Sequence, residues 1–169
     1  MKTSERSFEK ITDEDLKRLA SIAATDRRDF LSRKPQYTGD FLCSALCQGA
    51  ALQFVDRKNG VKDFDVWSFY AEKKGVPSFP YRRHARADFG GSKFGKEPGE
   101  SLKDRRVDIF GRSIVSNGNA IESVQRYLRD HPTRVAYFLA EKAAVLLEPA
   151  NLRGTIIWRV KESHAEKMP

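Results

Sequence analysis

The sequence lacks the long hydrophobic runs and the cysteine patterns that mark membrane and disulfide-stabilised proteins. No apolar run approaches the roughly 18–20 residues that a membrane-spanning helix needs, and residues 1–6 lack the apolar stretch of a signal peptide. The two cysteines, Cys43 and Cys47, lie in an apolar segment with no second pair to complete a metal site, so we expect buried free thiols. These absences favour a cytoplasmic protein without a membrane partner.

The length and composition indicate one globular unit. The chain has 169 residues, of which 40% are hydrophobic and 32% charged, and it contains no internal repeat or low-complexity segment. We therefore expect a single domain spanning residues 1–169, with enough apolar side chains for a core. The sequence does not indicate the oligomeric state.

Positive charge is in excess and is concentrated in one segment. Thirty-one Lys and Arg residues against 23 Asp and Glu give a net charge of +8, with a sequence pI near 9.6. Residues 71–96 alone contain seven basic and two acidic residues. Such a balance is typical of proteins that bind nucleic acid or polyphosphate ligands.

Hydrophobic periodicity predicts an α/β (α+β) fold in which helices flank a small mixed sheet. The first helical segment is residues 10–34, with Thr12 as its N-cap. The core follows over residues 41–115 and includes a basic loop at 71–100. The C-terminal helical region is residues 119–148, within which we expect helices at 120–129 and 133–147. Strands are expected at 61–70, 105–115 and 155–160. The segment 41–55 is either one buried helix, or a strand to Cys47 followed by a helix from Gly49.

Asp63 and Asp65 form the sharpest chemical pattern. On a strand, residues i and i+2 point to one face about 6–7 Å apart. At an effective dielectric near 20 their repulsion is roughly 2–3 kcal/mol, so Lys or Arg, solvent or a divalent cation must compensate it. Asp108 lies between apolar residues in another predicted strand. If the two strands are neighbours, the three carboxylates converge into a candidate two-metal Mg²⁺ site, although an exposed sheet face can also carry Asp side chains without function.

These residues resemble the nucleotidyltransferase superfamily with the polymerase-β-like core, and most of all its toxin and abortive-infection branch. The likeness covers about residues 41–112: an apolar segment with Gly49, twelve residues between Ala50 and Asp63, the Asp-x-Asp pair, and the strand carrying Asp108. The surrounding sequence is also similar to a group of uncharacterised bacterial proteins, which implies no activity. The resemblance implies a nucleotidyltransferase-like fold and a Mg²⁺-dependent transfer of a nucleoside monophosphate from an NTP to a hydroxyl of an RNA, a protein or a small molecule.

The resemblance also assigns roles to individual residues. Asp63 and Asp65 would ligate the metals, and Asp108 would complete one metal site and help to activate the attacking hydroxyl. Gly49 would let the backbone approach the phosphates, and Lys142 matches a triphosphate-binding position, although it is also compatible with an ordinary surface lysine.

Two positions depart from the family's pattern. Ala50 replaces the family's Ser or Thr, and Gln48 replaces the preceding Gly. A hydroxyl contact to phosphate is therefore missing, and Gln48 or Ser44 is the available substitute. The departure motivates an alternative function, a catalytically inactive module of this fold that binds RNA or nucleotides.

The basic loop mixes aromatic and basic side chains, a composition suited to holding single-stranded RNA or covering a triphosphate. An ordinary solvated loop whose aromatic rings pack back on the sheet is equally compatible. We assign His84 no role. The candidate nucleic-acid-binding residues are Arg82, Arg83, Arg86, Lys93 and Lys96.

Other classes of function fit the sequence less well. A restriction-type nuclease needs an acid-x-Lys pattern, whereas Ile109 and Phe110 follow Asp108. No nucleophile elbow or Cys/His arrangement supports a hydrolase. A further alternative is a protein whose basic loop binds an acidic partner surface.

Overall fold

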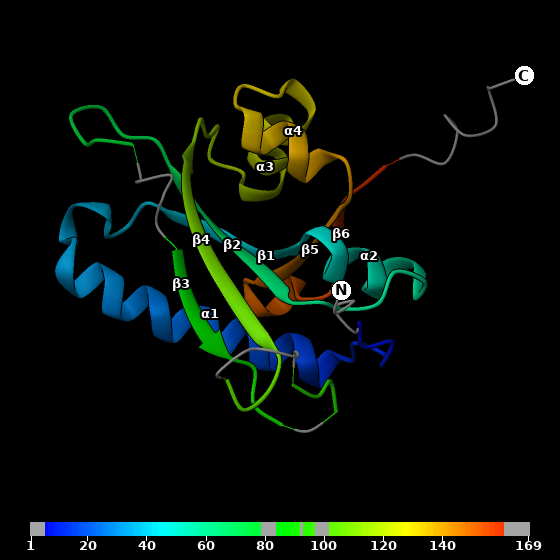
Figure 1. The fold of residues 1–169 in the computed structure, drawn as a ribbon. Helices are drawn as coiled ribbons and strands as arrows, with labels where there is room; N and C mark the ends of the chain where they lie inside the picture. Colours follow the sequence, from blue (N-terminus) through cyan, green and yellow to red (C-terminus); the bar gives the residue numbers. More distant parts are fainter. Residues whose placement is uncertain (1–5, 79–83, 92, 97–101, 161–169) are drawn as a thin grey trace, which may run out of the picture.

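The computed structural model describes residues 6–78, 84–91, 93–96 and 102–160 (Figure 1). Its helices are α1 (Asp13–Arg33), α2 (Gln48–Asp56), α3 (Ala120–Asp130) and α4 (Arg134–Ala140), with short 3₁₀ helices at Pro35–Tyr37 and Ala150–Leu152. Its strands are β1 (Phe41–Cys47), β2 (Phe64–Ala71), β3 (His84–Asp88), β4 (Arg106–Ile114), β5 (Ala143–Glu148) and β6 (Ile156–Arg159). The predicted fold class, a mixed sheet flanked by helices, is confirmed.

The strands form one mixed sheet in the order β3-β4-β2-β1-β5-β6. β2 and β4 are parallel, and every other neighbouring pair is antiparallel. β2 and β4 begin at the same end of the sheet, so residues near their starts lie side by side. This parallel pair joins two segments far apart in the sequence.

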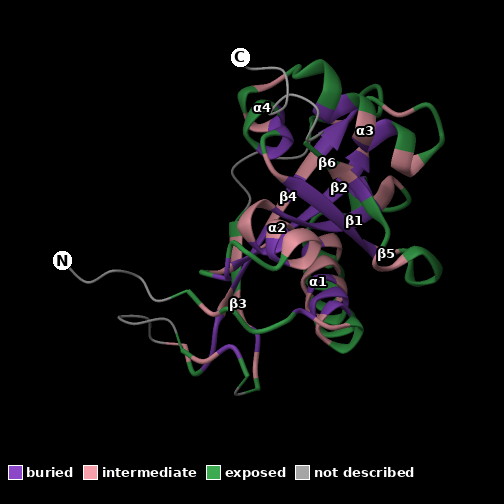
Figure 2. Cartoon of the chain, turned by 90° about the vertical axis from the view of Figure 1, so that its right-hand side faces the viewer, coloured by how far each residue is buried: buried purple, intermediate pink, exposed green. Residues whose placement is uncertain are grey.

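Each face of the sheet is covered by its own pair of helices. α1 and α2 pack on one face, around Leu46, Phe64 and Val66. α3 and α4 pack on the other face, around Ala45, Trp67 and Leu146 (Figures 1 and 2). Because side chains alternate along a strand, Asp65 and Asp108 lie on the α3/α4 face, whereas Val66 and Val107 face α1.

Local sequence signals explain where the helices begin. Thr12 caps α1 as predicted: its hydroxyl accepts from the Asp15 backbone, and the Asp15 carboxylate accepts from the Thr12 backbone. Asn119 and Thr133 cap α3 and α4 through their side-chain oxygens.

Three predictions about individual elements can now be judged. Of the two alternatives for 41–55, the strand followed by a helix is the observed one. The predicted helix 133–147 is wrong beyond Ala140: the apolar residues 143–148 form the buried strand β5. The predicted loop 71–100 contains strand β3, which pairs with β4. A continuous apolar run does not distinguish a buried strand from a buried helix, which accounts for the second error.

The end of α2 yields a stability prediction. Arg57 is an exposed residue with φ +60°, and its backbone N–H bonds to the carbonyl of Gln53 at 2.9 Å. A residue with a Cβ pays about 1–2 kcal/mol in this left-handed conformation, whereas glycine does not. We expect Arg57→Gly to raise the free energy of unfolding by about 0.5–1 kcal/mol in urea titrations. Arg57→Ala is the matched control and should give no gain; an Ala variant as stable as the Gly variant would contradict this explanation.

Candidate metal and phosphate site

The structure brings the three predicted carboxylates together. Asp65 on β2 is the register partner of Asp108 on β4, and Asp63 lies directly before β2. One carboxylate oxygen from each residue lies within 4.8 Å of the others. Among the described side chains, this is a group of hard oxygen ligands at the spacing that a divalent cation can bridge.

Arg106 holds two of these carboxylates. Its Nη2 lies 2.8 Å from Asp63 Oδ2, and its Nε lies 3.0 Å from Asp108 Oδ2. Arg106 and Asp108 are two residues apart on β4, so their side chains share one face of the sheet. The side chain of Asp108 is only 6% exposed, so its negative charge requires such a partner.

Asp65 differs from its neighbours. Within the described part of the chain its carboxylate has no hydrogen bond or ion pair, although Arg106 and Lys142 act on it through space. Burial, followed by the negative charges of Asp63 and Asp108, raises the pKa of Asp65 to about 7, while Arg106 and Lys142 oppose this rise. Asp65 is therefore the carboxylate whose charge is least compensated.

Two residues of β3 complete the surroundings of Asp108. His84 Nε2 lies 2.6 Å from Asp108 Oδ1, and Arg86 Nε lies 3.9 Å from the same oxygen. The sequence assigns His84 no role, because a loop over residues 71–100 pairs it with no strand, whereas the structure pairs it with Phe110 of β4. The alternation His84-Ala-Arg-Ala-Asp88, in which polar residues recur at every second position, is the signal that could have revealed the strand.

The predicted phosphate-binding residues Gln48 and Gly49 are the first two residues of α2, directly after β1. Cys47 at the end of β1 is the register partner of Asp65, and α2 starts immediately after it without a side-chain cap. Gln48 has φ +60°, which is strained for a residue with a side chain. Gly49 leaves room, since an added Cβ would meet only Arg6 Nη1, at 3.7 Å.

Lys142 lies in the turn between α4 and β5, not on the helix that the sequence predicted. It is close enough to the cluster to lower the pKa of Asp65.

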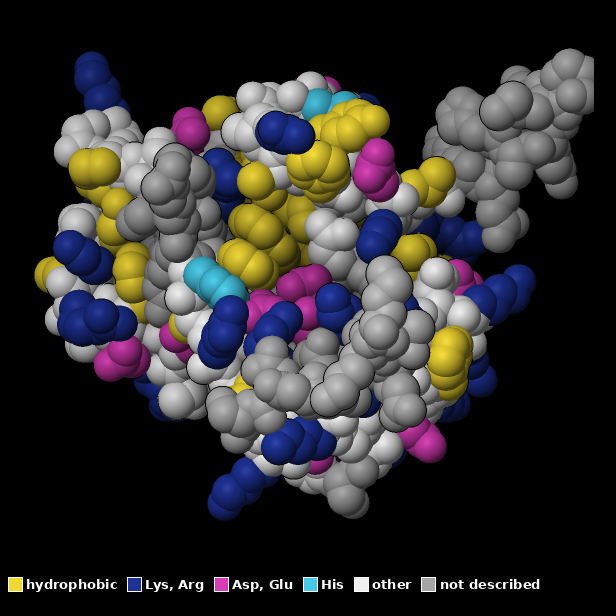
Figure 3. All heavy atoms as spheres, in the orientation of Figure 1, with side chains coloured by type: hydrophobic (Ala, Val, Ile, Leu, Met, Phe, Trp, Pro, Cys, Tyr) yellow, Lys and Arg dark blue, Asp and Glu magenta, His cyan; other side chains and the backbone are white. Residues whose placement is uncertain are grey.

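Figure 3 shows one face of the molecular surface. Acidic side chains gather near its centre, bordered by Lys and Arg side chains, with an apolar patch beside them.

The candidate nucleic-acid-binding residues do not act as one group. Arg86 is 60% exposed beside Asp108, whereas Lys93 bonds to Asp15 of α1 at 2.6 Å. Lys96 is exposed, and Arg82 and Arg83 lie outside the described residues.

Two aromatic rings of the basic loop are unavailable for stacking on bases. Phe89 and Phe94 are 5% and 2% exposed and pack on Phe64 with ring centroids 4.8 and 5.1 Å away. Of the two alternatives for the aromatic rings of the loop, packing back on the sheet is the observed one for Phe89 and Phe94, because they belong to the hydrophobic core.

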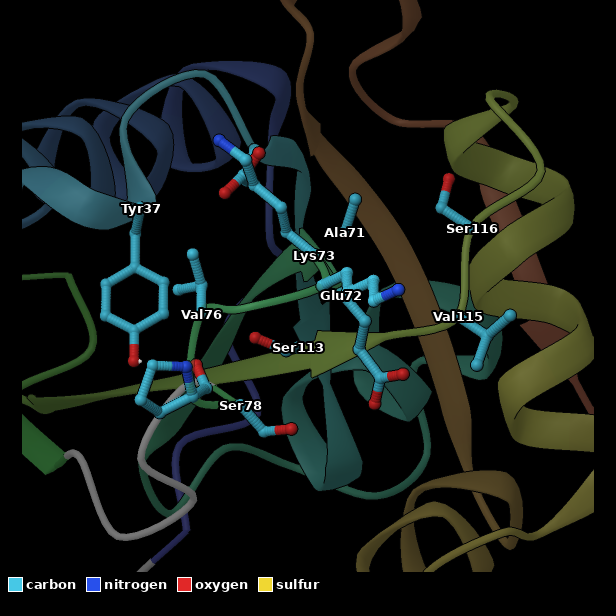
Figure 4. Close-up of a pocket in the computed structure, with 12 residues that line it drawn as sticks. Tyr37, Ala71, Glu72, Lys73, Val76, Ser78, Ser113, Val115 and Ser116 are labelled. Carbon is cyan, nitrogen blue, oxygen red and sulfur yellow. Dashed lines mark hydrogen bonds between the residues drawn. The ribbon is translucent and has the colours of Figure 1, made fainter.

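A separate cavity of about 370 Å³ lies at the opposite ends of β2 and β4 (Figure 4). Ala71, Glu72, Lys73 and Ser113 line it, and it contains none of the three carboxylates.

No helix in the described residues is long and apolar enough to span a membrane. Neither models of known protein families nor curated protein sequences match this chain.

The isolation of Asp65 predicts a pH-dependent stability. The pKa of Asp65 is about 7 in the folded protein and about 3.9 in the unfolded chain, so folding favours its protonated form. Its contribution to the free energy of unfolding therefore falls as pH rises from about 4 to 7. We expect Asp65→Asn to stabilise the metal-free protein by about 2 kcal/mol at pH 8, and by less toward pH 4, in urea titrations with EDTA.

The matched control is Asp63→Asn. Because Asp63 accepts from Arg106, its neutral variant should not be stabilised at pH 8. A gain for Asp65→Asn that is the same at pH 8 and pH 4 would contradict the titration argument.

Proposed function

We propose that this protein transfers a nucleoside monophosphate from an NTP to a hydroxyl acceptor in a reaction that depends on a divalent cation, Mg²⁺ being the natural candidate. The observation that carries the proposal is the asymmetry of the carboxylate cluster. Three carboxylates converge, and Asp65 is the one whose negative charge the neighbouring basic side chains compensate least.

The donor set fits the chemistry of Mg²⁺. This ion takes oxygen ligands, and it is usually bound by one or two carboxylates together with substrate phosphates. Asp63, Asp65 and Asp108 would hold it, with the guanidinium of Arg106 moving off the carboxylate oxygens that it now contacts. A bound ion would polarise the phosphoryl oxygens and ease deprotonation of the attacking hydroxyl.

Residues at the same end of the sheet offer phosphate contacts. The uncapped start of α2 presents backbone N–H groups next to the register partner of Asp65, and Gly49 adds no side chain there. Ala50 is buried in the core, so no hydroxyl at that position contributes. Lys142 supplies a positive charge from the turn before β5.

In the proposed reaction, the acceptor oxygen bonds to the α-phosphorus while the bond from that phosphorus to the bridging oxygen breaks. Pyrophosphate leaves, and the hydroxyl proton passes to a carboxylate of the cluster, for which the resemblance designates Asp108. The acceptor class stays open among RNA, protein and small molecules.

The first test measures ligand binding. We expect Mg²⁺ with ATP to raise the Tm of the wild-type protein, and Asp65→Asn to weaken Mg²⁺-dependent ATP binding at least tenfold by calorimetry, because a metal ligand is lost. Transfer of α-³²P-labelled nucleotide to an RNA or protein acceptor should fall at least 100-fold. Asp130→Asn, an exposed aspartate at the end of α3, is the matched control and should behave as wild type. Unchanged binding and transfer in Asp65→Asn would refute the proposal.

A second candidate function is binding of nucleotide or RNA without turnover. It is favoured by Arg106, which already neutralises part of the charge of Asp63 and Asp108. On this hypothesis binding is sensitive to salt and to the arginines of the basic loop, and it survives substitution of the cluster.

Arg106 separates the two candidates. Arg106→Gln removes the guanidinium that bonds to Asp63 and Asp108, so we expect it to destabilise the metal-free protein by about 3 kcal/mol. If the cluster is a metal site, Mg²⁺ should raise the Tm of Arg106→Gln more than that of wild type, since the ion replaces the lost charge. An equal, small Mg²⁺ effect on both proteins would favour the non-catalytic module.

A further inference from the structure

Three aromatic rings form a stack across the strands that carry the cluster. His84 on β3, Phe110 on β4 and Trp67 on β2 are register partners in sequence across the sheet. The His84 and Phe110 ring centroids lie 4.8 Å apart at an interplanar angle of 8°. Phe110 and Trp67 lie 4.8 Å apart at 18°. The three rings are therefore nearly parallel and in contact.

The stack and the carboxylates occupy the same face of the sheet. Phe110 is two residues after Asp108, and Trp67 is two residues after Asp65. This spacing places the aromatic row about 6–7 Å along the strands from the acidic row. A ligand that combines a metal-bound phosphate with a flat ring would match both rows.

His84 is the end of this stack that a ligand can reach. β3 is the edge strand of the described sheet, and the His84 side chain is 36% exposed. One face of its ring lies on Phe110, and its Nε2 bonds to Asp108. The orientation of the ring is thus fixed on two sides, while the described residues place no further strand or ring against its outer face.

We propose that the outer face of His84 is a stacking platform for the heterocyclic base of a nucleotide whose phosphates lie at the carboxylate cluster. This inference rests on the proposed function. In a nucleotide, one sugar separates the base from the nearest phosphate. His84 and Asp108 are in direct hydrogen-bond contact, so one nucleotide is long enough to place its base on His84 and its phosphates at the cluster. A stacked base gains affinity through its π-face, so purines should bind more tightly than pyrimidines.

The experiment compares ligands with and without a base. Calorimetry measures Mg²⁺-dependent binding of ATP, of inorganic tripolyphosphate and of a short oligoadenylate to wild type, His84→Ala, His84→Phe and the control Tyr137→Leu. Tyr137 is a 49% exposed ring of α4 that contacts His131 and Phe138. We expect His84→Ala to weaken ATP binding about tenfold and to leave tripolyphosphate binding within twofold. His84→Phe, which keeps a flat ring but loses the bond to Asp108, should restore ATP binding to within threefold of wild type.

The two probes that contain a base identify its source. Weaker ATP binding in His84→Ala assigns the platform to the NTP, and weaker oligoadenylate binding with unchanged ATP binding assigns it to an RNA end. If His84→Ala weakens ATP and tripolyphosphate binding equally, His84 acts through Asp108 and not as a stacking surface. If His84→Ala leaves the binding of both base-containing ligands unchanged, the stacking proposal is refuted. If tripolyphosphate and ATP both fail to bind wild type, the proposed function itself fails, and the platform falls with it.

Discussion

The parallel pairing of β2 with β4 is the constraint on which the site depends. In this register Asp65 on β2 lies next to Asp108 on β4, and Asp63 lies directly before the first residue of β2. At an effective dielectric near 20, each such pair of charges repels by roughly 2–4 kcal/mol, a large share of the stability of one domain. Arg106 on β4 and Arg86 on β3 offset part of this cost, and His84 on β3 lies within hydrogen-bond distance of Asp108. The strand register thus brings the carboxylates together and also places basic side chains of β3 and β4 beside them.

The two hydrophobic cores explain why the cluster remains accessible. One face of the sheet is covered by α1 and α2, and the other by α3 and α4. On the second face, apolar cover extends over Trp67 and Phe69 but gives way to charged side chains toward the start of β2, where Asp65 lies. The same strands therefore supply the aromatic side chains of Trp67 and Phe110 and, two residues earlier, the partly exposed Asp65 and the buried Asp108. This juxtaposition of an apolar and an acidic row follows directly from the two-residue period of a strand.

Much of this arrangement could be predicted from the sequence, because it depends on local signals. The Asp-x-Asp spacing, the apolar setting of Asp108 and the cap at Thr12 all act within a few residues. The rest depends on partners that are distant along the chain. β3 is a short edge strand inside a segment rich in glycine and charge, and pairing with β4 is what defines it. The apolar run at 143–148 becomes a strand because β1 and β6 flank it, which periodicity alone does not reveal. The contact between Arg106 and Asp108 could also be predicted, since a strand containing Arg-Val-Asp puts its first and third side chains on one face.

In the proposed metal site, Arg106 and the bound cation would compete for the same carboxylates. Arg106 reaches Asp63 through Nη2 and Asp108 through Nε, so its planar guanidinium spans the two outer carboxylates. Asp65 receives only a through-space contribution, and burial keeps its pKa near 7. The neighbouring basic side chains thus offset the three acids incompletely, which leaves the pKa of Asp65 raised by burial and by the charges of Asp63 and Asp108. A divalent ion could contact all three at once, because their oxygens lie within 4.8 Å. It would favour the ionised form of Asp65 and release Arg106 toward an incoming phosphate, so that one guanidinium serves the empty and the loaded site in turn.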